Sequence, residues 1–149
     1  MKKTVLALMA MLLVSFSFAD LASAQKIRNA KITDLTELSQ KFIKDYFSDL
    51  KIDDITVDGT RKAEVEFTDG TDLEFGMDGF WKEIENDGGI PLERLKMLPG
   101  QMTTSLKDDF GEYKIKKVDR KDLLYEVELE GKNNKEIKIR YDLNGQYLF

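Results

Sequence analysis

The spacing of hydrophobic residues changes along the chain from a helical period to an alternating one. Between Asp34 and Leu50 apolar residues recur every three or four positions, which predicts an amphipathic helix that begins near Asp34. Its expected core-facing residues are Leu35, Leu38, Phe42, Tyr46 or Phe47, and Leu50. From Ile52 onward the period becomes two, as in "AEVEF", residues 63–67, which is typical of half-buried β-strands.

Asp-Gly pairs at 58–59, 69–70 and 78–79 separate these strand-like runs. Tight hairpin turns need residues that tolerate a positive φ, which Gly supplies. Between two of these turns, "DLEFGM" places Leu73, Phe75 and Met77 on one face. No window has the ligand spacing of an EF-hand, so we interpret the acidic glycine pairs as turns and predict no metal site.

The same order of elements begins again after "NDGGIP", residues 86–91, which we interpret as a linker. A second helical segment, interrupted at Pro99, precedes four strand-like runs, "YKIKKVD", "LLYEVELEG", "NKEIKIRYD" and "GQYLF". We therefore predict an α+β fold made of a tandem repeat, residues 34–85 and 92–149. Each copy has a helix followed by a four-stranded antiparallel meander, with the helices packed on one face of the sheet.

The N-terminus has the features of a cleaved secretory signal peptide, residues 1–24. Lys2 and Lys3 precede an apolar run of about 14 residues, shorter than the roughly 20 that a membrane-spanning helix needs. Small residues then lead to a predicted cleavage after Ala24, and residues 25–33 form a polar lead-in. We expect a periplasmic or secreted protein; an uncleaved anchor is the alternative.

Composition excludes several kinds of catalytic site. The chain has no His and no Cys, which removes Ser-His-Asp triads, thiol nucleophiles, disulfides and the commonest zinc ligand. Its net charge of −5 disfavours nucleic acid and anionic membranes as partners. The many carboxylates alternate along strands, as on a solvated sheet face, so we predict neither enzyme activity nor a cofactor.

Strand alternation predicts an acidic face. If Val65, Phe67, Leu73, Phe75 and Ile84 face the helix, then Glu64, Glu66, Glu74, Trp81, Glu83 and Glu85 face away from it. In the second copy Lys138 and Arg140 can pair with Glu126, Glu128 and Glu130 on the neighbouring strand, so the first copy would be the acidic one.

The candidate binding residues are those of this face together with Tyr147, which takes the place of Trp81 in the second copy: Trp81, Tyr147, Glu64, Glu66, Glu74 and Glu83. An exposed Trp beside carboxylates would anchor a basic partner. In the alternative, Trp81 covers the sheet edge or packs between the copies while the carboxylates are merely solvated. A one-residue bulge at Gly76 or Gly79 would also exchange the faces of that strand.

The segments "KKVDRKD", "YEVEL" and "IRYDLNGQY" resemble the PepSY-like domain, also described as beta-lactamase-inhibitor-like, of exported Bacteroidetes-type proteins. The resemblance implies a helix packed across one face of an antiparallel sheet, with the other face partly open. In the inhibitor relatives, that face and its loops grip an enzyme. This chain has no Cys and no matching inhibitory loop, so inhibition of a beta-lactamase is not inferred.

Together these features predict an exported, non-catalytic binding module. It would recognise a protein or peptide, preferably a basic one, through the open sheet face, as an inhibitor or an envelope chaperone. The alternative is a small-ligand or cation-binding periplasmic protein. A continuous open face would favour the first function, and a closed pocket lined by Trp81 and Tyr147 would favour the second.

Overall fold

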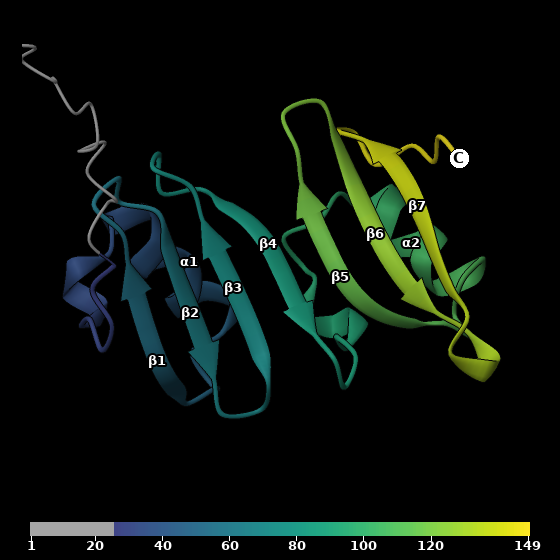
Figure 1. Ribbon diagram of the computed structural model, residues 1–149. Coiled ribbons are helices and arrows are strands. Elements are labelled where there is room, and N and C mark those ends of the chain that lie inside the picture. Colours follow the sequence, from purple (N-terminus) through teal and green to yellow (C-terminus); the bar gives the residue numbers. More distant parts are fainter. Residues whose placement is uncertain (1–25) are drawn as a thin grey trace, which may run out of the picture.

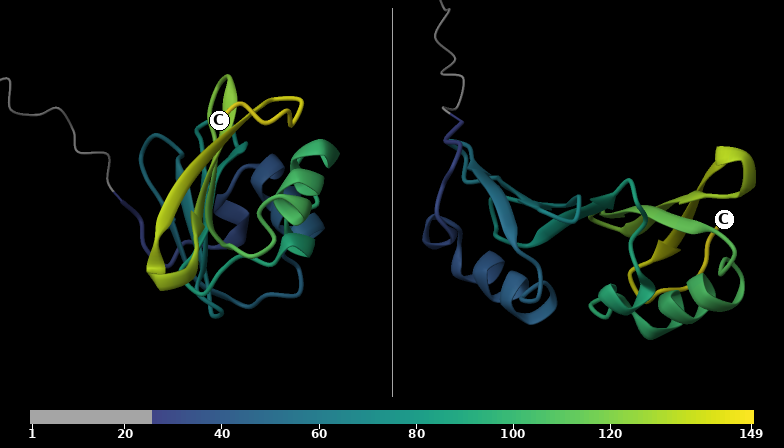
Figure 2. Two further views of the ribbon diagram at one scale, coloured as in Figure 1. Left: turned by 90° about the vertical axis from the view of Figure 1, so that its right-hand side faces the viewer. Right: turned by 90° about the horizontal axis from the view of Figure 1, so that it is seen from below.

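The computed structural model describes residues 26–149, so the predicted signal peptide and its cleavage site after Ala24 lie outside the described residues. Seven strands form one antiparallel sheet in chain order, and both helices lie on the same face of it (Figures 1 and 2). The elements are α1 (Glu37–Tyr46), β1 (Ile52–Val57), β2 (Ala63–Phe67), β3 (Thr71–Phe75), β4 (Trp81–Asn86), α2 (Gly100–Asp108), β5 (Lys114–Arg120), β6 (Leu124–Glu130) and β7 (Glu136–Asp142). Short 3-10 helices are η1 (Ile32–Asp34), η2 (Leu92–Arg94) and η3 (Lys132–Asn134). The α+β prediction is confirmed.

The second half of the sheet is shorter than the sequence predicts. The run "GQYLF" forms no strand of its own and makes only an isolated bridge between Tyr147 and Tyr141. It nevertheless covers part of the β7 edge, because the Leu148 amide donates to the Arg140 carbonyl at 2.9 Å. At the opposite edge Ile27 pairs with Val57 of β1. Both outer strands are therefore partly covered by the chain's own ends.

Two of the three predicted Asp-Gly turns have glycine in the left-handed region, with φ of 85° at Gly70 and 80° at Gly79. In the first turn Arg61 takes the positive φ instead, and the Asp58 carboxylate accepts the backbone N–H of Lys62 at 3.0 Å. The prediction that Met77 faces the core is wrong. Strand β3 ends at Phe75, so Met77 lies in the following turn and is exposed.

Helix α1 begins later than predicted. Thr36 is its N-cap and accepts the Ser39 amide, whereas Asp34 accepts the Lys31 amide within the preceding 3-10 turn. This shift turns Leu38 toward solvent, contrary to the prediction, and buries Ser39, whose hydroxyl donates to the Gly79 carbonyl at 3.0 Å. The helix is thereby held against the β3–β4 turn.

Helix α2 begins where the sequence predicts an interruption. Pro99 precedes its first residue, and Met102 and Leu106 are buried against the sheet at the predicted four-residue spacing. Phe110 lies beyond the end of the helix and is half-buried. The second helix therefore covers the second half of the sheet with fewer apolar residues than the pattern predicts.

The predicted orientation of Trp81 is wrong. Val65, Phe67, Leu73, Phe75 and Ile84 are buried on the helix face as predicted, and Trp81 is buried with them, 6% exposed. The cause is a register shift, because Glu74 pairs with Glu83 while Phe75 pairs with Trp81, which leaves Lys82 as an extra residue in β4. The bulge exchanges the faces of the strand at its start.

Trp81 fills the junction between the two halves of the sheet. Its ring lies 6.0 Å from that of Phe42 on α1 and 6.1 Å from that of Tyr125 on β6, and both pairs are stacked. Two further register shifts, at residues 52–54 of β1 and 115–117 of β5, bend the sheet. Viewed from below, the sheet is twisted, and both helices lie on the same side of it (Figure 2).

Truncation of Trp81 tests this packing. We expect Trp81→Ala to lower the free energy of unfolding by about 3–5 kcal/mol, because it removes a buried aromatic ring between two others. Urea unfolding followed by circular dichroism measures the change. The control is Leu123→Ala, which removes an exposed apolar side chain and should change stability by less than about 0.5 kcal/mol. Equal stability of the two variants would place Trp81 on the open face.

Candidate functional site

The open face carries an unbroken line of carboxylates from strand to strand. Residues that pair directly across antiparallel strands share one face of a sheet, and the register aligns one such residue from each strand. The Glu64 row consists of Glu64, Glu74, Glu83, Asp119, Glu126 and Arg140. Five acidic residues therefore follow one another before the row ends in a cation.

A second row runs parallel to the first. The Glu66 row consists of Glu66, Asp72, Glu85, Lys117, Glu128 and Lys138. Acidic residues occupy β2, β3 and β4, whereas cations and carboxylates alternate from β5 to β7. We call the part of both rows on β2–β4 the acidic half of the open face. Its composition agrees with the prediction that the first half is the acidic one.

Few cations neutralise the acidic half. Lys26 of the lead-in contacts Glu64 at 3.3 Å, and Lys117 of β5 contacts Glu83 at 2.6 Å and Glu85 at 3.3 Å. Within residues 26–149, Glu66, Asp72, Glu74 and Asp119 of the two rows make no ion pair. Sequence reasoning missed Asp72 and Asp119, although Asp72 shares the strand alternation of Glu74.

The second half neutralises its own charge, as predicted. Glu126 is buried and accepts hydrogen bonds from Lys121 and Arg140, each at 2.9 Å, which hold the pKa of its carboxyl below the usual value. Glu128 pairs with Lys138 across β6 and β7 at 2.5 Å. The same fold therefore carries balanced charge on one half of its open face and net negative charge on the other.

Burial and neighbouring carboxylates raise two pKa values in the acidic half. Burial is the largest cause for Glu83, and together with the carboxyls of Asp119 and Glu74, and against the opposing effect of Lys117, it raises the pKa of Glu83 to about 7. Burial also raises the pKa of Asp72, with repulsion from Glu66 and Glu64 as the next causes. Burial and repulsion therefore disfavour the ionised forms of Glu83 and Asp72.

A shallow cavity of about 270 Å³ opens on the acidic half. Glu64 and Glu74 line it together with Thr56, Lys62 and Phe75. Lys26 also lines this cavity and contacts Glu64 at 3.3 Å, while the Phe75 side chain is buried on the helix face.

The predicted aromatic pair is not assembled. Trp81 lies beneath the sheet against α1, while Tyr147 is 46% exposed near the C-terminus, where its ring lies 5.8 Å from Phe110 and 5.7 Å from Tyr141. The prediction that Trp81 stands among the carboxylates is therefore corrected, since its bulged strand turns it to the helix face. Glu64, Glu66, Glu74 and Glu83 do lie together on the open face.

Exposed apolar side chains gather on the hairpin tips at one end of the sheet, which sequence reasoning did not find. Met77 and Phe80 come from the β3–β4 turn, Leu123 from the β5–β6 turn and Leu143 from the turn after β7. Phe80 and Leu143 line one shallow cavity, and the Arg120 guanidinium lies 5.2 Å from the centre of the Phe80 ring. We call these four residues the apolar tips.

Within residues 26–149 there is neither a cluster of metal-ligating carboxylates nor a membrane-spanning helix. This part of the chain contains no group of three or more Asp or Glu residues placed to hold a metal ion. None of its helices is long and apolar enough to span a bilayer.

Residues 61–148 match the model of a protein family described as "Putative beta-lactamase-inhibitor-like, PepSY-like". No curated protein matches the chain. The fold is similar to a "putative calcium-regulated periplasmic protein" from Bacteroides thetaiotaomicron, with a TM-score of 0.67 and 25% identity over 83% of this chain and 94% of the other.

Two proteins from Bacteroides vulgatus have a similar fold. One is a "putative periplasmic protein of unknown function", with a TM-score of 0.67 and 24% identity over 84% of this chain and 98% of the other. The other is a "putative periplasmic protein" of the DUF2874 family, with a TM-score of 0.64 and 23% identity over 84% and 95% of the two chains.

The raised pKa of Glu83 predicts a pH dependence of stability. Its unfolded value is 4.5 and its folded value about 7, so the folded state binds the proton more tightly. This contribution is complete below pH 4.5 and is lost as the pH rises through 7. Relative to Glu83→Gln, the wild type should lose about 1–2 kcal/mol between pH 5 and 8 in urea unfolding.

The matched control for this experiment is Glu85→Gln, which removes the other carboxylate on Lys117. It should keep the wild-type slope between pH 5 and 8. A Glu83→Gln variant that keeps the same slope would show that Glu83 is ionised throughout this range in the folded protein.

Proposed function

The chain belongs to the PepSY-like, beta-lactamase-inhibitor-like family, and we propose that it is a non-catalytic periplasmic module that binds a basic protein or peptide through the acidic half of its open face. The observation that carries the proposal is the run of cross-strand carboxylates in the Glu64 and Glu66 rows. Like charges directly opposite each other on paired strands destabilise a sheet. Lysine or arginine side chains of a partner would relieve that repulsion.

The shape of the face supports a macromolecular partner. The face is continuous across seven strands, and both helices lie on the opposite face, so a broad partner surface can reach it (Figure 2). The apolar tips lie at one end of the sheet and would add hydrophobic contact at the rim. They replace Trp81, which is buried, as the expected apolar anchors.

The sheet edges suit this role less well than the face. Addition of a partner strand requires free backbone groups along an outer strand. The lead-in covers part of β1 through Ile27, and the C-terminal residues cover part of β7 through Leu148. Recognition through side chains on the face is therefore favoured over backbone pairing at these covered stretches.

The proposal also includes a periplasmic location and an origin of the chain by duplication. The three similar structures are described as periplasmic proteins, and the N-terminal sequence has the features of a signal peptide. We place this chain in the periplasm as an inhibitor or an envelope chaperone. The helix-then-meander order of residues 34–85 and 92–149, separated by the linker 86–91, supports an origin by duplication, with "GQYLF" as the reduced last strand of the second copy.

Charge reversal tests the binding face. Mature protein, the double variant Glu66→Lys/Glu74→Lys and the control Asp108→Lys/Glu112→Lys would each be used to capture partners from envelope extract of the source organism. The control makes the same charge change on exposed residues outside the open face. We expect wild type and control to capture the same basic protein, and the open-face variant to lose at least tenfold in affinity for that protein once purified.

Salt dependence separates this result from a loss of folding. The captured partner should dissociate faster as the salt concentration rises, because exposed charges are screened over about 10 Å at 0.1 M salt. All three proteins should give the same circular dichroism spectrum. Equal affinity of the open-face variant and the wild type for the partner would refute the acidic half as the binding surface.

A second candidate function is cation-dependent regulation. The similar protein from Bacteroides thetaiotaomicron is described as calcium-regulated, and the carboxylate rows could attract Ca²⁺. If this function is correct, titration with CaCl₂ should give saturable heat and raise the melting temperature more than MgCl₂ or KCl at equal ionic strength. Identical effects of the three salts would show that Ca²⁺ acts only by screening charge and has no specific site.

A further inference from the structure

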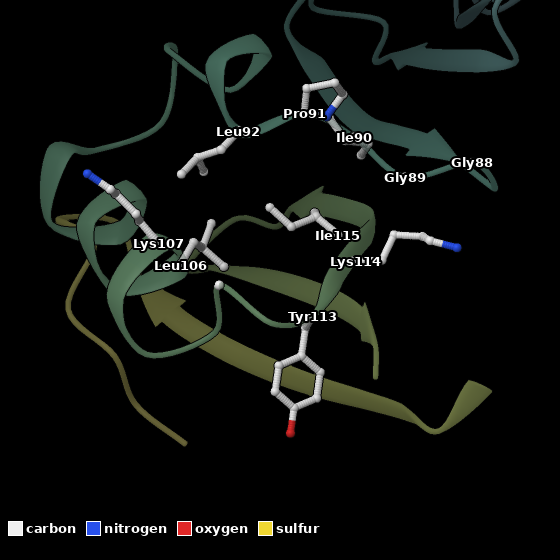
Figure 3. A pocket seen from close by; sticks show the side chains of 11 residues that line it. Gly88, Gly89, Ile90, Pro91, Leu92, Leu106, Lys107, Tyr113, Lys114 and Ile115 are labelled. Carbon is white, nitrogen blue, oxygen red and sulfur yellow. The ribbon is translucent and has the colours of Figure 1, made fainter. Parts of the chain in front are cut away.

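An apolar cleft lies on the other side of the molecule, between the linker and helix α2. Its volume is about 490 Å³, within the range of small-molecule sites. Residues 88–91 of the linker and Leu92 of η2 form one wall, and the end of α2 with the start of β5 forms the other. Figure 3 shows the side chains of Ile90, Leu92, Leu106 and Ile115 turned toward the space between these walls.

The floor of the cleft is aliphatic and rigid. Leu106 is 2% exposed, and Ile90 and Ile115 are buried as well. The Ile90 amide donates to the Ile115 carbonyl at 2.7 Å, which fixes the linker to β5 at the base of the cleft. Gly89, with φ of 101°, allows the linker to approach Lys114 closely, since a Cβ there would lie 2.5 Å from a carbon of the lysine side chain. The cleft is therefore preformed by the fold.

Charge at the cleft is opposite to that of the whole protein. The chain has a net charge of −5, yet the residues that line the cleft include Lys107 and Lys114 and no Asp or Glu. The Lys114 ammonium group forms an ion pair with the Glu130 carboxylate at 2.9 Å. Lys107 is exposed in the last turn of α2 and makes no ion pair within residues 26–149. Lys107 therefore supplies an ammonium group beside the cleft, and Figure 3 shows this group pointing outward from the aliphatic side chains.

We propose that this cleft binds an aliphatic monocarboxylate, such as a fatty acid of medium chain length. The hydrocarbon chain lies on Ile90, Leu92, Leu106 and Ile115, and the carboxylate accepts a charge-assisted hydrogen bond from Lys107. The negative net charge of the protein disfavours small anions in general. A ligand of this cleft therefore needs both an apolar body, which the aliphatic residues bind, and one negative end, which Lys107 binds. This site is separate from the acidic half and does not depend on the proposed protein partner.

The first test uses octanoate as the probe with the mature wild-type protein. Calorimetry should give one saturable site, and amide shifts in heteronuclear NMR spectra should be largest at residues 88–92 and around Leu106. Octanol and octylamine carry the same chain without the negative charge, and both should bind at least tenfold more weakly. Octanol binding as tightly as octanoate, shifts centred elsewhere, or the absence of binding would each overturn the proposal.

The second test uses charge variants at equivalent places on the two helices. Lys107→Glu should weaken octanoate binding by about tenfold or more. The control is Lys44→Glu, because Lys44 is exposed in the last turn of α1 and lies outside the cleft. It should leave the affinity unchanged. Equal affinity of both variants for octanoate would show that Lys107 does not bind the carboxylate.

The aliphatic floor is tested separately. Leu92 is half-buried at the cleft, so Leu92→Ser should weaken octanoate binding with little change in fold. Affinity of the wild type should rise from hexanoate to octanoate as more of the chain is buried. If affinity does not depend on chain length, the hydrocarbon does not lie in the cleft and the proposal fails.

Discussion

The junction between β4 and β5 is the constraint on which the single sheet depends. The two strands pair only over Glu83–Glu85 and Lys117–Asp119, and a long connection through η2 and α2 separates them in sequence. Trp81 stabilises this short ladder from below, stacked between Phe42 of α1 and Tyr125 of β6. Aromatic burial of this size contributes several kcal/mol, more than so few backbone hydrogen bonds. One bulged residue, Lys82, places Trp81 there.

A second contact supports the same junction on the helix side. Arg94 of η2 donates two hydrogen bonds to the Asp49 carboxylate, at 2.9 and 3.0 Å, and its guanidinium lies 5.8 Å from the ring of Phe47. This bidentate pair joins the segment after α1 to the connection that precedes α2. Because both helices lie on one face, all these contacts hold that side of the sheet and leave the other face uncovered by either helix (Figure 1).

Strand faces could be predicted from the sequence wherever alternation is unbroken. The buried positions of β2 and β3 follow directly from "AEVEF" and "DLEFGM", and with them the positions of Glu64, Glu66 and Glu74 on the opposite face. The prediction failed at Trp81, since a bulge inserts one residue and depends on how the turn and the helix above it pack together.

A contact between residues distant in sequence also decides which residues of α1 are buried. Ser39 takes the place of Leu38 on the buried face of α1 because its hydroxyl bonds to the Gly79 carbonyl. The apolar tips and the cleft beside α2 require several loops to be placed in space, for which alternation gives no information. The paired charges of the second half were predictable, because opposite charges occupy the same positions on neighbouring strands.

The contrast between the two halves shows that the fold itself does not require an acidic surface. On β6 and β7 the same open face is balanced by Lys138 and Arg140, which pair with Glu128 and Glu126 on the neighbouring strand. Carboxylates that repel one another on β2–β4 are therefore retained at a cost to stability, which is a common property of sites that act on another molecule. Lys117 marks the border. It belongs to β5, yet it contacts Glu83 and Glu85 of β4, and among the carboxylates of the two rows that follow it only Asp119 makes no ion pair within residues 26–149.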